Sequence, residues 1–474
     1  MNHTDSGLPV RCGIHLIVTR FLSPGRIMKR NSEMAEREVF DLNHLNRTYL
    51  KLALPVASGM IVTLLYNLAD TWFIAQTGNK ALVAGVSLCA PVFTTLMAFG
   101  NIYGQGGSSL ISRMLGKGDG EGAGRASAFC FYIAIATGLL MCALMLGFRV
   151  PLLHLAGTSQ NTFAYADSYF RVMAVGAPFV VLNFIHLNLV RCEGMAAQSM
   201  IGSVLGSVVN IILDPVLIFV LDLGAEGAAA ATVLGYLCSD LFFLVLVLRK
   251  SRSLSVRPSD CHIDRWELGQ ILGVGISAAL TNLMQSLSVV ILNHSLLPYG
   301  DDKIAAMGIV LRVSMIAQLV LIGLAFGGVP LFGYLYGAKK YTETKRLIRF
   351  CLSFLGTLAL ALTVILLLFA TPLISIFMKD PVIVSEGTRM LRWQATGTVF
   401  FAVSLLFTVL FQASGRVFSA LLMSVSRQGI LFAATITLGT LLLGYTGILC
   451  AQPAADVLSV VLALVLYRRM ARAH

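Results

Sequence analysis

The sequence predicts an all-α integral membrane protein with twelve transmembrane helices in two six-helix lobes related by pseudo-two-fold symmetry. Three observations predict this fold. Hydrophobic residues occupy 57% of the 474 positions and charged residues only 12%, whereas a soluble domain of this length needs a mixed, charged exterior. Apolar runs long enough to cross about 30 Å of hydrocarbon recur along the chain. An internal repeat divides these runs into two sets of six.

The positions of the apolar runs predict the spans, because a helix needs about 20 residues to cross the membrane. The twelve spans are 52–76, 85–111, 127–148, 166–190, 196–221, 227–248, 268–297, 304–335, 350–376, 388–411, 417–443 and 447–467. We expect four regions: a cytoplasmic tail (1–50), a first lobe (51–250), a basic cytoplasmic linker (251–266) and a second lobe (267–474). The natural start is either Met1 or Met34, where a polar and then amphipathic segment begins.

The basic residues predict the orientation. The formal net charge is +12, and 27 of the 35 lysines and arginines fall on one side if the amino terminus is cytoplasmic. The positive-inside rule then places both termini in the cytoplasm of a cell-membrane protein. No aromatic residues interleave with these charges, which argues against nucleic-acid binding. The nine cysteines include no CxxC pair, so we expect no metal framework and no resident cofactor.

The internal repeat has an offset of 221 residues. The segment "YFRVMAVGAPF" (169–179) aligns with "MLRWQATGTVF" (390–400), and "GGSSLISRMLG" (106–116) aligns with "GGVPLFGYLYG" (327–337). Because six is an even number, both halves start on the same side of the membrane. The repeats are therefore predicted to be parallel and related by an axis along the membrane normal.

Four acidic residues lie well inside the predicted spans: Asp70, Asp214, Asp240 and Asp456. An aspartate in the middle of a transmembrane helix costs about 2.5 to 3.5 kcal/mol on insertion scales, so each is a candidate functional residue that faces the protein interior. For Asp240, near the inner end of its helix, and for Asp456, near a proline, a structural contact is as plausible as a role in transport.

Asp70 and Asp214 are predicted to lie at one depth, about 12 Å from the outer end of their helices. Tyr66 precedes Asp70 by four residues and Asn210 precedes Asp214 by four, so each pair shares a helix face. Thr232 enters the same layer from the sixth span. Carboxylate, amide and hydroxyl oxygens suit a proton or a hard cation such as sodium.

Two further observations bear on this site. Pro215 has no N–H to donate to the carbonyl of Ile211, which leaves that oxygen free near the acids. At the offset of 221, the counterparts of the two aspartates are Ile291 and Thr435, so ion handling is expected in the first lobe. The alternative is that both aspartates only join neighbouring helices.

Several long motifs together resemble the multidrug and toxic compound extrusion (MATE) transporters. They are "LALPVASGMIVTLLYNLADTWFIAQTG", "NIILDPVLIFVLDLGAEGAAAATVLGY", "SRMLGKGD", "GYLYGAKK" and "SRQGILF". The resemblance extends from Leu52 to Arg469. It implies two lobes around a central cleft, and export of cationic or amphipathic organic compounds in exchange for protons or sodium.

The resemblance also implies roles for particular residues. The ion site of the family corresponds to Tyr66, Asp70, Asn210, Asp214 and Thr232. Its first-helix proline corresponds to Pro55, which is implied to allow helix bending, as is Pro215. Some branches carry acids in the seventh and tenth helices, where this chain has Asn282, Gln285 and Gln394. This difference favours the branch that keeps its coupling acids in the first lobe.

The expected partners are small cationic molecules and the lipid bilayer, and a monomer is expected. Candidate residues of the substrate cavity, which serve equally well in ordinary packing, are Tyr169, Phe179, Met200, Tyr236, Asn282 and Gln285.

Two other functions are less favoured. A flippase of lipid-linked precursors needs a cationic cavity and often extra helices, whereas this chain has twelve spans and few suitable arginines (Arg171, Arg312, Arg389 and Arg392). An enzyme is not expected, because the loops are short and present no paired histidines or phosphate-binding motif.

Overall fold

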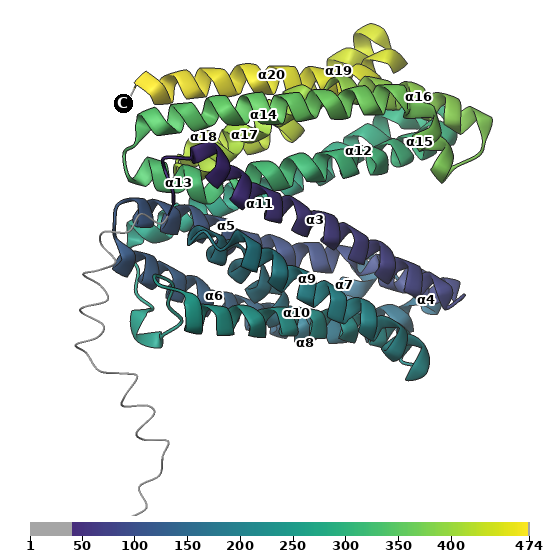
Figure 1. Ribbon diagram of the computed structural model, residues 1–474. Helices are drawn as coiled ribbons and strands as arrows, with labels where there is room; N and C mark the ends of the chain where they lie inside the picture. Colours follow the sequence, from purple (N-terminus) through teal and green to yellow (C-terminus); the bar gives the residue numbers. More distant parts are fainter. Residues whose placement is uncertain (1–39, 473–474) are drawn as a thin grey trace, which may run out of the picture. The chain divides into compact units, whose positions relative to one another are not determined.

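The structure is a computed structural model that describes residues 40–472, and the chain from Leu42 onward forms one compact unit. Within the described residues all regular structure is helical (Figure 1). The helices of the first half are α3 (Leu45–Gln76), α4 (Lys80–Leu88), α5 (Ala90–Gly116), α6 (Gly120–Gly147), α7 (Arg149–Leu155), α8 (Gln160–Cys192), α9 (Ala196–Pro215), η1 (Val216–Val220) and α10 (Gly224–Lys250). Those of the second half are α11 (Arg265–Leu296), η3 (Leu297–Tyr299), α12 (Asp301–Gly327), α13 (Val329–Gly337), α14 (Tyr341–Leu368), α15 (Ala370–Phe377), α16 (Pro381–Thr396), α17 (Thr398–Ala413), α18 (Val417–Val425), η4 (Ser426–Ile430), α19 (Leu431–Leu443) and α20 (Tyr445–Arg472). A short turn, η2 (Pro258–Asp260), lies between the halves.

The predicted fold class is confirmed. The described chain has eleven helical segments that are long and apolar enough to cross a membrane, and a twelfth if the bent pair α16–α17 counts as one span. The pair bends by 44° at Gly397. A Cβ on Gly397 would lie 3.0 Å from Asp456 Oδ2 and 3.2 Å from Pro453 Cα. The bend therefore lets α16 and α17 pack closely on α20.

The predicted boundaries differ from the observed ones mainly at polar helix ends. The predicted span 350–376 begins nine residues after the observed start of α14 at Tyr341 and runs across the break after Leu368. Hydropathy detects neither feature, because a polar first turn outside the hydrocarbon is still helical and an apolar run does not reveal a change of direction. The question of Met1 or Met34 as the start lies outside the described residues.

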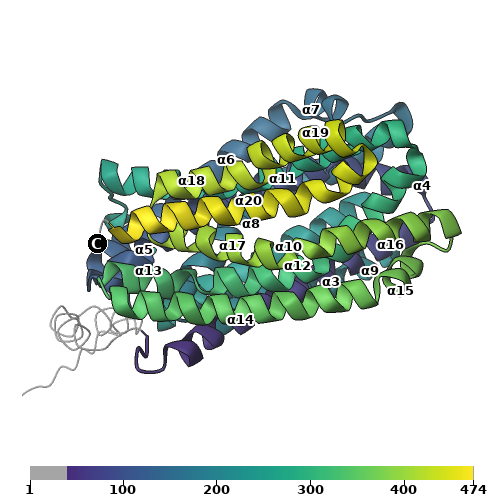
Figure 2. The same cartoon turned by 90° about the horizontal axis from the view of Figure 1, so that it is seen from above.

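The two halves lie on opposite sides of this unit. In Figure 1, α5, α6, α8, α9 and α10 lie in the lower part and α12, α14, α16 and α20 in the upper part, with α3 running between them, and Figure 2 shows the same bundle from above. We call the end that carries residues 251–264 the linker end. The start of α3 and the end of α20 also lie there (Figure 1), as expected for an even number of spans.

One contact between the halves is made where α5 crosses α11 near the linker end. A Cβ on Gly106 would lie 2.0 Å from the carbonyl oxygen of Ile271, and one on Gly275 would lie 1.9 Å from that of Ile102. Only glycine fits at these positions, since no real Cβ comes so close to a backbone oxygen. Small residues let transmembrane helices approach in this way.

A second crossing between the halves joins α12 to α3 and is the symmetry equivalent of the first. Cβ atoms on Gly323 and Gly327 would lie 2.5 and 2.4 Å from the Cα atoms of Ala57 and Ala53. Small residues again line both sides of the crossing. The two crossings are copies of one helix contact.

Matching the two crossings corrects the register of the first helix. Ala53 corresponds to Ile271 and Ala57 to Gly275, an offset of 218. The offset is smaller than 221 because the second half has three more residues between Ile271 and Gly327 than the first half has between Ala53 and Gly106. The counterpart of Asp70 is therefore Ser288 and not Ile291.

A third contact relates the halves reciprocally. A Cβ on Gly116 would lie 2.1 Å from the carbonyl oxygen of Tyr334, and one on Gly337 would lie 2.1 Å from that of Arg113. These residues correspond at the predicted offset of 221. Each half thus makes the same contact with the other, as two-fold pseudosymmetry requires.

Candidate functional site

The first half brings Asp70 of α3 and Asp214 of α9 together. The two carboxyl groups lie within hydrogen-bonding reach of each other, and α3 packs along α9. Asp214 is fully buried, whereas Asp70 is partly accessible. Two carboxylates this close repel each other unless a proton or a cation lies between them.

Asn210 connects the carboxyl pair to α10. With its amide turned so that both ends are satisfied, Nδ2 donates to Asp214 Oδ2 at 3.2 Å. Its Oδ1 then accepts from Thr232 Oγ1 at 3.3 Å and from the Thr232 backbone N–H at 3.1 Å. The four-residue spacing of Asn210 and Asp214 places both on one face of α9. Three helices therefore contribute to one polar cluster, as the sequence analysis predicts.

Tyrosines surround the cluster. Tyr66, one turn before Asp70 on α3, interacts through its hydroxyl with Tyr236 of α10. Tyr169 of α8 lies close enough to both carboxyl groups to interact with them electrostatically. The two predicted cavity residues Tyr169 and Tyr236 thus lie beside the predicted ion site.

The other predicted cavity residues lie apart from the cluster. Met200 packs its Cγ against Gly59, where a Cβ would be 3.7 Å away, so it joins α9 to α3. Phe179 is half-buried on α8, and Asn282 and Gln285 are exposed on α11 in the second half.

The two prolines occupy different settings. Pro55 lies inside α3, which continues from Leu45 to Gln76. Pro215 ends α9 and is followed by the π-helical turn η1, a kind of local irregularity that occurs often at functional sites. Their roles in helix bending stay predictions.

The cluster lies near the end of the bundle opposite the linker. Asp70 is six residues before the end of α3 and Asp214 is six residues before the end of η1, which is about 9 Å along each axis. Polar side chains beside it on α3, Asn67 and Thr71, are exposed, although polar groups in a transmembrane helix normally avoid lipid. The contacts between the halves described above lie toward the linker end. This arrangement fits access to the cluster from the opposite end.

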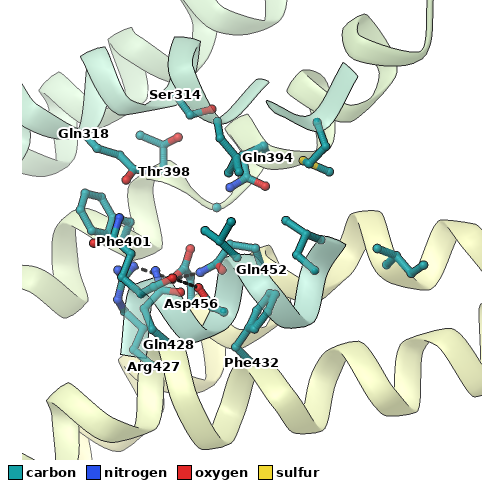
Figure 3. A pocket seen from close by; sticks show the side chains of 18 of the residues that line it. Ser314, Gln318, Gln394, Thr398, Phe401, Arg427, Gln428, Phe432, Gln452 and Asp456 are labelled. Carbon is teal, nitrogen blue, oxygen red and sulfur yellow. Dashed lines mark hydrogen bonds and ion pairs between the residues drawn. The ribbon is translucent and has the colours of Figure 1, made fainter. Parts of the chain in front are cut away.

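The second half contains a different polar pocket (Figure 3). Arg427 Nη1 lies 3.1 Å from Asp456 Oδ1, which also accepts from Gln452 Nε2 at 3.2 Å. The Arg427 guanidinium lies 4.6 Å from the centre of the Phe401 ring. Asp456 is 3% exposed. The buried carboxylate is therefore balanced by a partly buried guanidinium, and the structural contact considered for Asp456 is present.

The cavity beside this ion pair has a volume of about 60 Å³. Besides the ion pair, its polar lining comprises Gln285, Ser288, Ser314, Gln318, Gln394, Thr398, Gln428 and Gln452. The Oε1 of Gln428 and the Oγ of Ser314 are buried and make no hydrogen bond within the described residues. A polar cavity of this size has room for a few water molecules.

Arg427 is an intramembrane residue that the sequence did not predict, because it is one of the 27 basic residues assigned to the inner side of the membrane. The structure corrects this. Arg427 lies ten residues beyond Val417, where the span starts, and within the π-helical turn η4. The signal available in the sequence was the pair formed by "SRQGILF" and the acid in "AQPAADVL", since a basic and an acidic residue inside adjacent spans predict a buried ion pair.

Comparisons with known proteins agree with this fold. The model of the MatE family matches residues 55–216 and 277–444. The Multidrug export protein MepA of Staphylococcus saprophyticus is 30% identical over 427 residues, which cover 90% of this chain and 94% of that protein. The protein of the same name from a Staphylococcus aureus strain shows the same identity and coverage.

Solved structures are also similar. An outward-facing multidrug resistance MATE family transporter of the MOP superfamily superposes with a TM-score of 0.84 and 25% identity, covering 90% of this chain and 96% of that one. A MATE in a straight conformation gives a TM-score of 0.84 and 25% identity, with 92% and 97% covered. On the matched family model, the relatives and the fold, this chain is a member of the MATE transporter family.

Proposed function

We propose that this protein is a secondary active exporter of cationic or amphipathic organic compounds, which it exchanges for protons or sodium ions. The observation that supports this most is the carboxyl pair of Asp70 and Asp214, held by Asn210 and Thr232 inside the first half. The groups that contact the pair among the described residues are carboxyl, amide and hydroxyl groups. A proton, a sodium ion or an organic cation each lowers the negative charge of such a site.

Competition between these ligands provides the coupling. When a proton or sodium ion occupies the pair, the negative charge that attracts a cationic compound falls, and the compound leaves. When the ion leaves, the charge returns and the site again favours the compound. The free energy of the ion gradient is thereby coupled to export, as reciprocal linkage between two ligands requires.

The proposed orientation has the linker end in the cytoplasm, so that both termini are cytoplasmic and the protein lies in the cell membrane as a monomer. The basic linker region supports this orientation. With the halves in contact near the linker end, the carboxyl pair faces the outside, where external ions reach it. Rocking of the halves about their glycine-lined crossings would then expose the pair to the cytoplasm.

The test compares gradients in proteoliposomes. Purified protein is reconstituted and efflux of a fluorescent cationic dye is measured with a pH gradient alone and with a sodium gradient alone. We expect one of these gradients to drive efflux. Asp70→Asn and Asp214→Asn should insert normally but lose gradient-driven efflux by more than about tenfold, within the usual range of coupling energies.

The matched control is Asp222→Asn, which removes an exposed carboxylate at the same end of the bundle. Its efflux should equal that of the unmodified protein. Undiminished gradient-driven efflux by both Asp70→Asn and Asp214→Asn would contradict the proposed site, and efflux that neither gradient drives would contradict the proposed antiport.

A further inference from the structure

A second acidic cluster lies deeper in the first half, between α8 and α10. His186 Nδ1 is 3.5 Å from Asp240 Oδ1, and Asn183 Nδ2 donates to the same oxygen at 3.1 Å. The side chains are almost fully enclosed, with His186 3% exposed and Asp240 4%. The sequence analysis left the role of Asp240 open, and this contact gives it an ionisable partner.

The surroundings leave part of this pair without hydrogen-bond partners. The ring centres of Phe131 and Phe243 lie 5.6 and 6.0 Å from that of His186. His186 Nε2 and Asp240 Oδ2 make no hydrogen bond to any group in residues 40–472. Buried polar atoms are rarely left in this state, because each costs free energy. An imidazole and a carboxylate in this setting are suited to gaining or losing a proton.

A chain of polar groups connects this pair to the carboxyl pair. Tyr236 precedes Asp240 by one helical turn on α10, and its hydroxyl interacts with that of Tyr66 on α3. Tyr66 in turn precedes Asp70 by one turn. A helical turn separates side chains by about 5 to 6 Å, a distance that a rotated side chain or one water molecule bridges.

Within residues 40–472, no charged side chain from the other helices contacts the pair. α6 contributes the Phe131 ring, and α9 approaches α10 through Gly202 and Gly206. On α8, the cation Arg191 donates to Ser199 Oγ at 3.0 Å rather than to Asp240. Arg191 also lines a polar cavity of about 10 Å³ further toward the linker end, which is about the space of one water molecule.

We propose that His186 and Asp240 form a second proton-binding site, which carries protons between the Asp70–Asp214 pair and the linker end. The proposal rests on the proposed function with protons as the coupling ion. In the transfer, a carboxyl of the outer pair gives a proton to the Tyr66 hydroxyl, which passes its own to Tyr236. Tyr236 passes its own proton to Asp240, so one proton moves inward and both hydroxyls end unchanged.

The experiment separates proton movement from compound movement in proteoliposomes that contain the full chain. Dye efflux driven by a pH gradient is compared with dye-for-dye exchange at equal pH, which needs no net proton flow. Asp240→Asn and His186→Gln should reduce the driven efflux by about a hundredfold, the lower end of the range for loss of a proton-transfer group. The rate of dye-for-dye exchange should stay within about twofold of that of the unmodified protein, because substitutions without a specific effect usually change free energies by no more than this.

Tyr236→Phe keeps the aromatic ring and removes only the hydroxyl of the proposed connection, and it should reduce driven efflux by a larger factor than it reduces exchange. The controls are His154→Gln and Asp222→Asn, which change exposed residues of the same types and should leave both rates unchanged.

Three results would overturn the proposal. The first is driven efflux by Asp240→Asn and His186→Gln at the unmodified rate. The second is an equal loss of exchange and driven efflux in these variants, which indicates a structural role. The third is an unmodified protein that responds to sodium alone, which removes the proton pathway but keeps the antiport. An unmodified protein that neither gradient drives would instead remove the proposed function itself.

Discussion

The two halves share one helix arrangement but differ in how they balance buried charge. In the first half, Asp70 and Asp214 meet each other among amide and hydroxyl groups. In the second half, Asp456 meets Arg427. Binding an external cation stabilises a carboxyl pair electrostatically, whereas it adds little stabilisation to a carboxylate that is already paired with a guanidinium. If the proposed function is correct, the charge balance, and not the scaffold, decides which half exchanges cations.

The pocket of the second half occupies nearly the position that pseudosymmetry assigns to the carboxyl pair of the first half. Ser288, the counterpart of Asp70 at the corrected register, lines it. At the offset of 221, Asp456 corresponds to Gly235, and a Cβ on Gly235 would lie 3.3 Å from Asn210 Cβ. The acid of the second half therefore enters the equivalent region from α20, together with its own cation.

Breaking the ion pair of the second half should have the largest effect. Arg427→Met leaves Asp456 buried without a cation, and we expect a loss of about 3 to 5 kcal/mol in the free energy of unfolding. Adding Asp456→Asn should recover most of this loss. In the first half, Asp70→Asn and Asp214→Asn should not lower stability, because they relieve repulsion.

The measurement is an unfolding titration in mixed detergent micelles, followed by tryptophan fluorescence. The double variant and both single variants form a cycle that isolates the interaction between Arg427 and Asp456. If Arg427→Met is as stable as the unmodified protein, the pair does not balance charge and the comparison between the halves fails.

The sequence predicts much of the fold because spans and buried acids are local signals. Twenty apolar residues identify a helix wherever it packs, and an aspartate within one is conspicuous without any structure. The same reasoning brings Asp70, Asp214, Asn210 and Thr232 to a common depth from their distances to helix ends. Their convergence in the structure follows from the packing of α3 and α10 against α9.

The missed features depend on residues far apart in the chain. Arg427 and Asp456 are 29 positions apart, and neither reveals the other until α19 and α20 pack together. Three additional residues shift the register of α11, so that a single offset assigns the wrong counterpart to Asp70. At the bend, a Cβ on Gly397 would lie 3.2 Å from Pro453 Cα, a close approach that no property of its own segment indicates.

The reciprocal contact at the linker end tests the symmetry of the halves. In Gly116→Ala and Gly337→Ala the new Cβ meets a backbone oxygen 2.1 Å away, so the helices must separate. We expect each substitution to destabilise the conformation in which the linker ends are in contact by about 1 to 3 kcal/mol. This corresponds to a change of about 5- to 150-fold in the equilibrium between that conformation and one in which the linker ends are apart. The two variants should change this equilibrium by the same factor.

Spin labels at the exposed positions Lys117 and Lys345 report the separation of the halves by pulsed electron paramagnetic resonance. The control is Gly120→Ala, since a Cβ there has no atom within 4 Å and the distance should not change. Unequal shifts in the two glycine variants would show that one half carries the closure alone.

The smallest expected effect compares one hydroxyl in each half. Thr232 interacts with Asn210 at the carboxyl pair, whereas Thr435, the counterpart of Asp214, donates to the Ala451 carbonyl at 2.9 Å. Replacing either threonine by valine removes one hydroxyl at nearly constant shape, at a cost of about 0.5 to 1.5 kcal/mol. Only Thr232→Val should raise the ion concentration for half-maximal efflux, by about two- to tenfold, because only that hydroxyl belongs to a site whose charge changes during transport. An equal change in Thr435→Val would mean that the second half also binds the coupling ion, and the distinction between a carboxyl pair and an internal ion pair would lose its functional meaning.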